Sequence, residues 1–159
     1  MTDWEERIRT FWLDASDVDQ ESTFGSMQAL VAERHDDDPA AVFEWASVHD
    51  FLGRGAEAIP LYRRALKLGL DPVRNSQAQI QLASSLRHVG ETTEAIEILQ
   101  GMQPDATVGD AHDAFLALAL FDAGRPGDAL RVALQALAKT LPLYRGAIDR
   151  YADAIVDSK

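Results

Sequence analysis

Three glycines, each flanked by alanines at fixed distances, constrain the fold of this chain more than any other feature. Gly53, Gly90 and Gly124 lie 37 and 34 residues apart. An alanine stands seven residues before each glycine and another five residues after it: Ala46, Ala83 and Ala117, then Ala58, Ala95 and Ala129. A recurrence near 34 residues indicates that one structural unit is repeated three times.

The order of these small residues predicts two packed helices in every unit. A glycine just beyond a helix can adopt the left-handed backbone conformation that ends it. The alanines allow the two helices, and then the next unit, to approach closely. One helix pair cannot bury its own apolar face, so the units must stack. The stretch EAIPLYRRAL is then the second helix of the first unit, with Pro60 early in it, where a missing N–H removes no intrahelical bond.

This pattern resembles the tetratricopeptide repeat family, and most of all its short stand-alone bacterial members. The resemblance covers residues 40–140, and beyond the small residues it rests on Trp45, Tyr62, Leu82 and Leu116. It implies an all-α fold, an α-helical solenoid of antiparallel helix pairs wound into a right-handed superhelix. Met102 departs from the family pattern because it replaces a second small residue. The connection near Pro104 is also irregular, and the second helix of unit two is predicted to be short.

We expect a single domain over residues 1–159. Apolar residues at helical spacing predict an N-terminal helical hairpin in residues 1–38 and a C-terminal capping helix in 141–157, on either side of three units in 40–140. The first 50 residues hold 13 acidic and 3 basic side chains, so the hairpin supplies the polar outer face that the end of a stack of repeats needs.

Charge and composition exclude several classes of function. The net charge is −11, which argues against nucleic acid as a partner because such proteins need a basic face. The longest apolar run, Ala114 to Phe121, is too short to cross a bilayer, which takes roughly 20 residues. There are no cysteines, and the N-terminus is charged from its third residue, so we expect a cytoplasmic protein without a membrane partner.

Two acidic clusters leave open an alternative function, a metal-dependent enzyme or regulator. These are His35-Asp38 and Asp110-Asp113. The first is also what a helix connection looks like, with Asp38 capping the next helix and Pro39 opening it. The second is explained equally well by acidic residues at the start of a helix. Because no nucleotide-binding or metalloprotease motif is present, we expect no catalysis, no cofactor and no metal.

A stripe on the first helix of each unit is the candidate site for binding another protein. In the resembling family these helices line a concave surface, and the stripe recurs in steps of three and four residues. The predicted groove comprises Phe43, Ser47, Asp50, Gln77, Ile80, Ser84, Arg87, Leu118 and Phe121.

We expect the apolar groove residues to contact a peptide or helix of the partner while the polar ones fix its orientation. The lysines and asparagines by which family members clamp a chaperone C-terminus are absent from this stripe. Two competing explanations are that the C-terminal helix covers Leu118 and Phe121, and that Asp50 pairs with Arg87. The stripe or the aromatic N-terminal helix could also form a homodimer.

Overall fold

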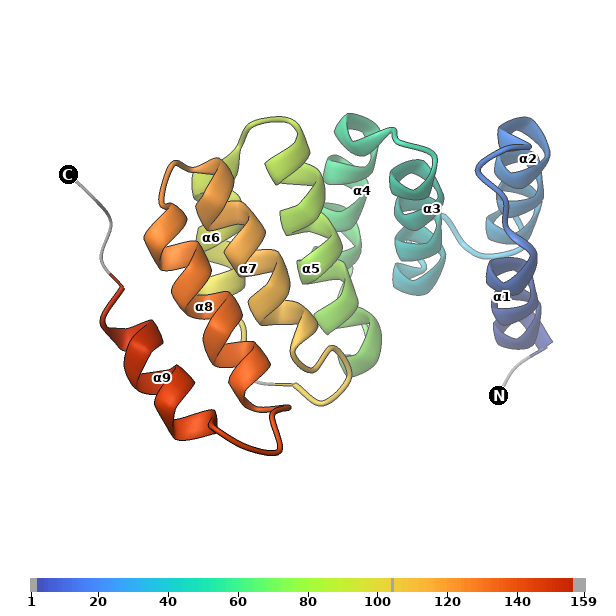
Figure 1. Cartoon of the computed structure of the whole chain (residues 1–159). Helices are drawn as coiled ribbons and strands as arrows, with labels where there is room; N and C mark the ends of the chain where they lie inside the picture. The colour runs from blue at the N-terminus through green and yellow to red at the C-terminus, as the bar shows by residue number, and fades with distance from the viewer. Residues whose placement is uncertain (1–2, 104, 156–159) are drawn as a thin grey trace.

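The computed structural model describes residues 3–103 and 105–155, which form nine α-helices and no strand (Figure 1). The ends of the predicted hairpin and capping helix, residues 1–2 and 156–157, lie outside the described residues. The helices are α1 Asp3–Asp14, α2 Gln20–Val31, α3 Pro39–Phe51, α4 Gly55–Leu68, α5 Pro72–His88, α6 Thr92–Gly101, α7 Ala111–Asp122, α8 Pro126–Ala138 and α9 Arg145–Asp153.

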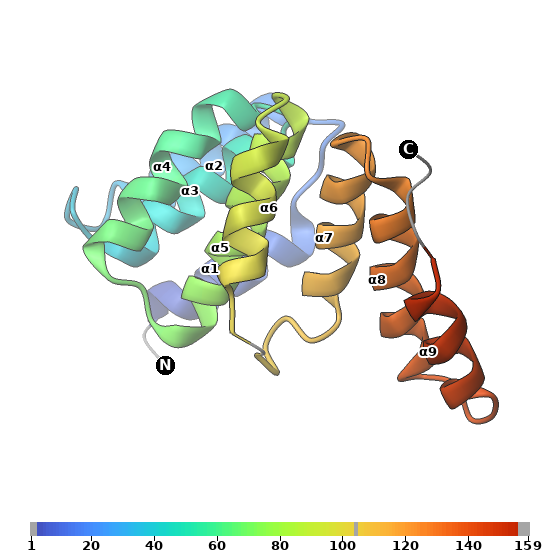
Figure 2. The ribbon, with the colours of Figure 1, turned by 90° about the vertical axis from the view of Figure 1, so that its left-hand side faces the viewer.

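The helices stack in chain order from α1 at one end of the molecule to α9 at the other (Figure 1). Each helix from α2 to α8 packs against the next, and α5 also contacts both α3 and α7. The first helices of the three units therefore lie side by side and share one face. Figure 2 shows α9 beside α8 at the edge of the stack. The prediction of an all-α fold is confirmed for the described residues, whereas the handedness of the superhelix stays a prediction.

The three repeated glycines end α3, α5 and α7 in the same way. Gly53, Gly90 and Gly124 have φ angles of 74°, 90° and 74°, in the left-handed region that glycine tolerates. After each, the next amide donates to the carbonyl five residues back, at 2.8, 2.9 and 2.9 Å. This is the Schellman motif, which satisfies carbonyls that the end of a helix leaves without a partner.

Gly90→Ala is expected to lower the free energy of unfolding by about 1–2 kcal/mol, because a side chain is strained in the left-handed conformation. Gly25→Ala is the matched control, since Gly25 lies inside α2 with open space around it and a φ outside that region. The control should stabilise by roughly 0.5–1 kcal/mol. Urea denaturation measures both changes, and equal effects would mean that the turn conformation is misassigned.

Pro60 lies deeper in its helix than the sequence pattern predicts. Because α4 begins at Gly55, Pro60 is its sixth residue and counts as internal. The expectation that its missing N–H costs no intrahelical bond is therefore wrong, since that N–H would have bonded to the carbonyl of Ala56. The predicted short second helix of unit two is confirmed, because α6 has 10 residues whereas α4 has 14 and α8 has 13.

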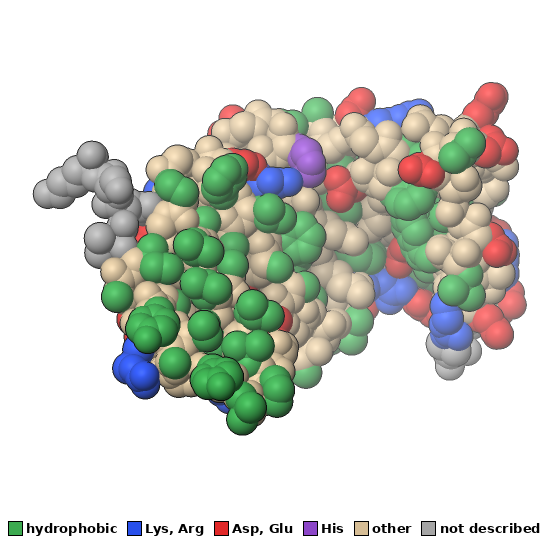
Figure 3. All heavy atoms as spheres, viewed as in Figure 1, with side chains coloured by type: hydrophobic (Ala, Val, Ile, Leu, Met, Phe, Trp, Pro, Cys, Tyr) green, Lys and Arg blue, Asp and Glu red, His purple; other side chains and the backbone are tan. Residues whose placement is uncertain are grey.

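The core is built on the repeated alanines. Five of these six are buried, and Ala117 is half-buried. One apolar cluster runs through α3 to α8 and includes the fully buried Tyr62, while a second joins α1 and α2 to α3 through Trp4, Ile8 and Met27. Toward the C-terminal end burial is less complete, and Figure 3 shows apolar side chains gathered on the surface over α7, α8 and α9.

Candidate functional site

Three polar contacts tie the first helices of neighbouring units together. Each joins side chains 34 or 35 residues apart, so the contacts repeat with the units: Ser47 to Gln81 (3.2 Å), Ser85 to Asp50 (2.8 Å) and Arg87 to Asp122 (2.8 Å). The first two join α3 to α5, and the third joins α5 to α7. These contacts fix how α3, α5 and α7 present their shared face.

A pocket of about 360 Å³ opens on this face at the end near the N-terminus. Its floor comes from α3 and α5, and α1 contributes a wall. The lining residues are Trp12, Phe43, Glu44, Ser47, Asp50, Phe51, Gln77 and Gln81. On α3 the lining positions 43, 47 and 50 follow the helical period, and 77 and 81 do so on α5. The Trp12 and Phe51 rings meet edge to face with centroids 5.8 Å apart.

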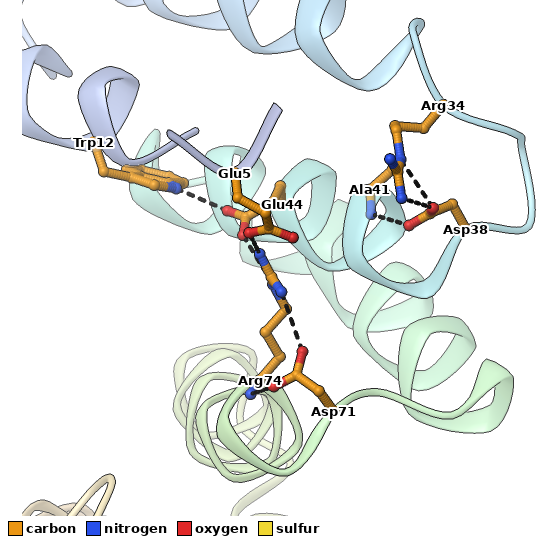
Figure 4. Close-up of polar contacts among 8 residues, drawn as sticks. All are labelled: Glu5, Trp12, Arg34, Asp38, Ala41, Glu44, Asp71 and Arg74. Carbon is orange, nitrogen blue, oxygen red and sulfur yellow. Dashed lines mark hydrogen bonds and ion pairs between the residues drawn. The ribbon is translucent and has the colours of Figure 1, made fainter. Parts of the chain in front are cut away.

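Helix α1 is held against the pocket by a polar network around the buried Glu44 (Figure 4). The Trp12 indole Nε1 donates to Glu44 Oε2 at 2.7 Å, and the Arg74 guanidinium donates to Glu44 Oε1 at 3.3 Å. Arg74 also pairs with Glu5 from α1 and with Asp71 at 3.1 Å. The network therefore joins α1, α3 and α5, although its members are far apart in sequence.

The two carboxylates of the pocket are held in an environment that disfavours charge. Burial raises the pKa of Glu44, and the Trp12 hydrogen bond and the Arg74 charge offset this only in part. Burial likewise raises the pKa of Asp50, despite the Ser85 hydrogen bond and the nearby His88 imidazole. Below the floor, burial raises the pKa of the Tyr62 hydroxyl well above its usual value. A positively charged ligand group would stabilise the ionised form of these two carboxylates.

The structure brings only part of the predicted groove to the open surface. Gln77, Leu118 and Phe121 are exposed, and Asp50, Ser84 and Arg87 are half-buried. Phe43, Ser47 and Ile80 are buried, because their positions turn toward the space between neighbouring helices. Phe43 and Ser47 still line the pocket, whereas Ile80 belongs to the core and offers no open apolar contact.

Neither competing explanation for the stripe agrees with the structure. Arg87 pairs with Asp122, whereas Asp50 accepts a hydrogen bond from Ser85, so the expected pair between Asp50 and Arg87 is not formed. Helix α9 packs against α8, and it leaves Leu118 at 47% and Phe121 at 63% exposure. The apolar end of the stripe is therefore open.

Four residues that line the pocket are not among the groove residues predicted from the sequence. Gln81 lies one helical turn after Gln77, so the same period could have identified it. Glu44 and Phe51 are each adjacent to a predicted groove residue and differ from it only in the direction that they face. No pattern in the sequence indicates Trp12, because its place depends on how the N-terminal hairpin folds back.

The acidic clusters that left open a metal-dependent function have structural roles. The Ala41 amide donates to Asp38 Oδ1 at 3.0 Å and Pro39 opens α3, as predicted. Lys139 pairs with both Asp110 and Asp113, at 2.9 and 2.8 Å. Across the described residues, no group of three or more His, Asp or Glu side chains is placed to hold a metal ion. None of the described helices is long and apolar enough to span a bilayer.

Comparison with known proteins identifies the repeats. The model of the tetratrico peptide repeat family matches residues 39–155, from the start of α3 to beyond the end of α9, and the α1–α2 hairpin lies outside this match. Neither the curated proteins nor the solved structures give a match. The matched region is most of the chain, and its turns and polar contacts repeat at the same spacing, so the chain belongs to the tetratricopeptide repeat family.

Proposed function

We propose that this chain is a protein-interaction module that binds a peptide or helix of a partner protein along the face shared by α3, α5 and α7. Catalysis is not part of the proposed role. The partner segment would lie over the pocket at one end of the face and over the apolar α7 surface at the other.

The observation that carries this proposal is the exposure of Leu118 and Phe121 on α7. Two large apolar side chains one helical turn apart are costly to leave in water, at about 25 cal/mol for each Å² of apolar surface. Family membership supports the same function, since helical repeat proteins present extended binding surfaces. Further exposed large apolar residues lie on α8, on α9 and in the connection between them: Leu130, Leu137, Leu143, Tyr144 and Tyr151.

The test is affinity capture with a charged double variant. Leu118→Glu with Phe121→Glu should reduce capture of a specific partner by about tenfold or more, because burying an unpaired carboxylate in an apolar contact is costly. Leu13→Glu with Val18→Glu is the matched control, since these residues are 81% and 91% exposed on and after α1. Capture that survives the first variant, with folding verified by circular dichroism, would place the binding surface elsewhere.

The oligomeric state of the purified chain is tested by a separate measurement. Light scattering of the purified chain distinguishes a monomer from a homodimer formed through this surface. If a dimer forms and the α7 double variant dissociates it, a second copy of this chain occupies the proposed site.

A further inference from the structure

We propose that the pocket between α1, α3 and α5 binds the side chain of an arginine carried by the partner segment. This inference rests on the proposed function, and it adds the chemistry of the residue that the partner must present. The pocket lies near the lower end of the size range of small-ligand sites, roughly 300–1,000 Å³, and so suits one long side chain.

The lining suits a planar cation. Glu44 and Asp50 supply carboxylate oxygens, Gln77 and Gln81 supply side-chain amides, and neither lysine nor arginine is among the lining residues. The aromatic rings of Trp12 and Phe51 form part of the wall. A guanidinium group combines five donors with a flat face that stacks on aromatic rings, so it matches both parts of this lining.

Asp50 is the carboxylate that a cation would engage first. Glu44 already accepts hydrogen bonds from Trp12 and Arg74. Asp50 accepts one from the neutral hydroxyl of Ser85, and it forms no ion pair with lysine or arginine in the described part of the chain. A half-buried carboxylate that forms no such ion pair is a natural place for an incoming positive group.

The Tyr62 hydroxyl lies behind the residues that line the pocket. Tyr62 is fully buried, and its hydroxyl makes no well-formed hydrogen bond, although the Ser47 hydroxyl lies close enough to act on it. The pocket-lining residues Ser47, Asp50 and Glu44 are the groups that act on this hydroxyl. Buried polar groups are rarely left unsatisfied, so the incomplete hydrogen bonding of this hydroxyl singles out the region behind these three lining residues.

The charge distribution favours the same ligand. The first 50 residues carry 13 acidic and 3 basic side chains, and they contain α1 and all of α3 except Phe51, two of the three helices that line the pocket. The negative potential of such a region attracts basic segments and repels acidic ones.

The test is an NMR titration that follows the indole N–H signals of the three tryptophans, with Trp12 assigned from a Trp12→Phe variant. The probe is N-acetyl-arginine methylamide, and N-acetyl-citrulline methylamide is its neutral isostere. Arginine should shift the Trp12 signal in a saturable way, with citrulline binding about tenfold more weakly because it lacks the charge.

Asp50→Asn is the variant that separates binding from folding. Its amide oxygen can still accept from Ser85, and it removes a carboxylate that burial disfavours, so the melting temperature should stay the same or rise. The preference for arginine over citrulline should disappear. Asp122→Asn, on the neighbouring α7, is the matched control and should retain that preference.

Equal shifts from the two probes, no saturable shift, or an unchanged preference in Asp50→Asn would each overturn the inference. The titration uses a single amino acid, so its failure leaves the proposed function untouched. Conversely, the absence of any captured partner would count against the proposed function and not against the pocket.

Discussion

Tyr62→Ala is expected to reduce the free energy of unfolding by about 3–5 kcal/mol, the range for removing a large aromatic ring from a core. Tyr62 is fully buried in α4 within the cluster that runs through α3 to α8, and its ring lies 6.1 Å from that of Phe43. The cavity left behind would lie between the first two units. The melting temperature should fall by roughly 6–20 °C, given about 2–4 °C per kcal/mol for a chain of this size.

Tyr151→Ala is the control for this substitution. Tyr151 is 69% exposed on α9, so its loss should change stability by no more than about 0.5 kcal/mol. Calorimetry of both variants measures the difference. A loss at Tyr62 that is no larger than at Tyr151 would mean that α4 does not pack between α3 and α5 as described.

Arg74→Met is expected to destabilise the chain by about 2–4 kcal/mol, because removing one partner leaves a buried carboxylate without its charge partner. Glu44 is buried, and Trp12 would be the only remaining donor of the network around it. Arg63→Met is the control, since Arg63 and Glu94 form an exposed pair whose contribution should be about 0–1 kcal/mol.

The effect of Arg74→Met should depend on pH in a defined direction. Burial raises the folded-state pKa of Glu44 above its ordinary value, so its ionised form opposes folding and its protonated form does not. The loss in free energy of unfolding relative to wild type is therefore largest near pH 7, and it becomes smaller as the pH falls through that raised pKa. A loss that is constant with pH would show that Arg74 acts by packing and not by charge.

The repeat architecture could be predicted because its signals are local. A glycine at the end of a helix and alanines at fixed distances from it specify a turn and a close approach within one unit. Gly53, Gly90 and Gly124 all adopt the expected conformation. The depth of Pro60 in α4 could not be predicted, because α4 begins after Arg54 without a side-chain cap that would mark its start.

The groove could be predicted only in outline. Helical spacing identifies the side of a helix, but it does not say where buried surface gives way to open surface. Phe43 and Ile80 fall on the buried side of that boundary. The pairing of Arg87 follows the spacing of 34 or 35 residues that also joins Asp50 to Ser85, and this spacing selects Asp122 over Asp50.

The wall of the pocket could not be predicted at all. Trp12 and Glu44 are 32 residues apart, and Glu5 and Arg74 are 69 residues apart. Their contact depends on how the N-terminal hairpin of α1 and α2 packs against the repeats, and no local pattern in the sequence specifies that packing. The family match begins at residue 39 and therefore gives no guidance for this hairpin.

Site-specific photo-crosslinking tests the central claim most directly, namely that the face shared by α3, α5 and α7 binds a segment of another protein. A photoreactive phenylalanine analogue would replace Gln77 on that face, the exposed Ala114 one helical turn before Leu118 on α7, or the exposed Lys67 on α4 as the control. Mass spectrometry would then identify the crosslinked peptide. We predict crosslinks from positions 77 and 114 to one continuous segment of one partner, and none to that segment from position 67. Crosslinks to that segment from position 67 alone would contradict the account.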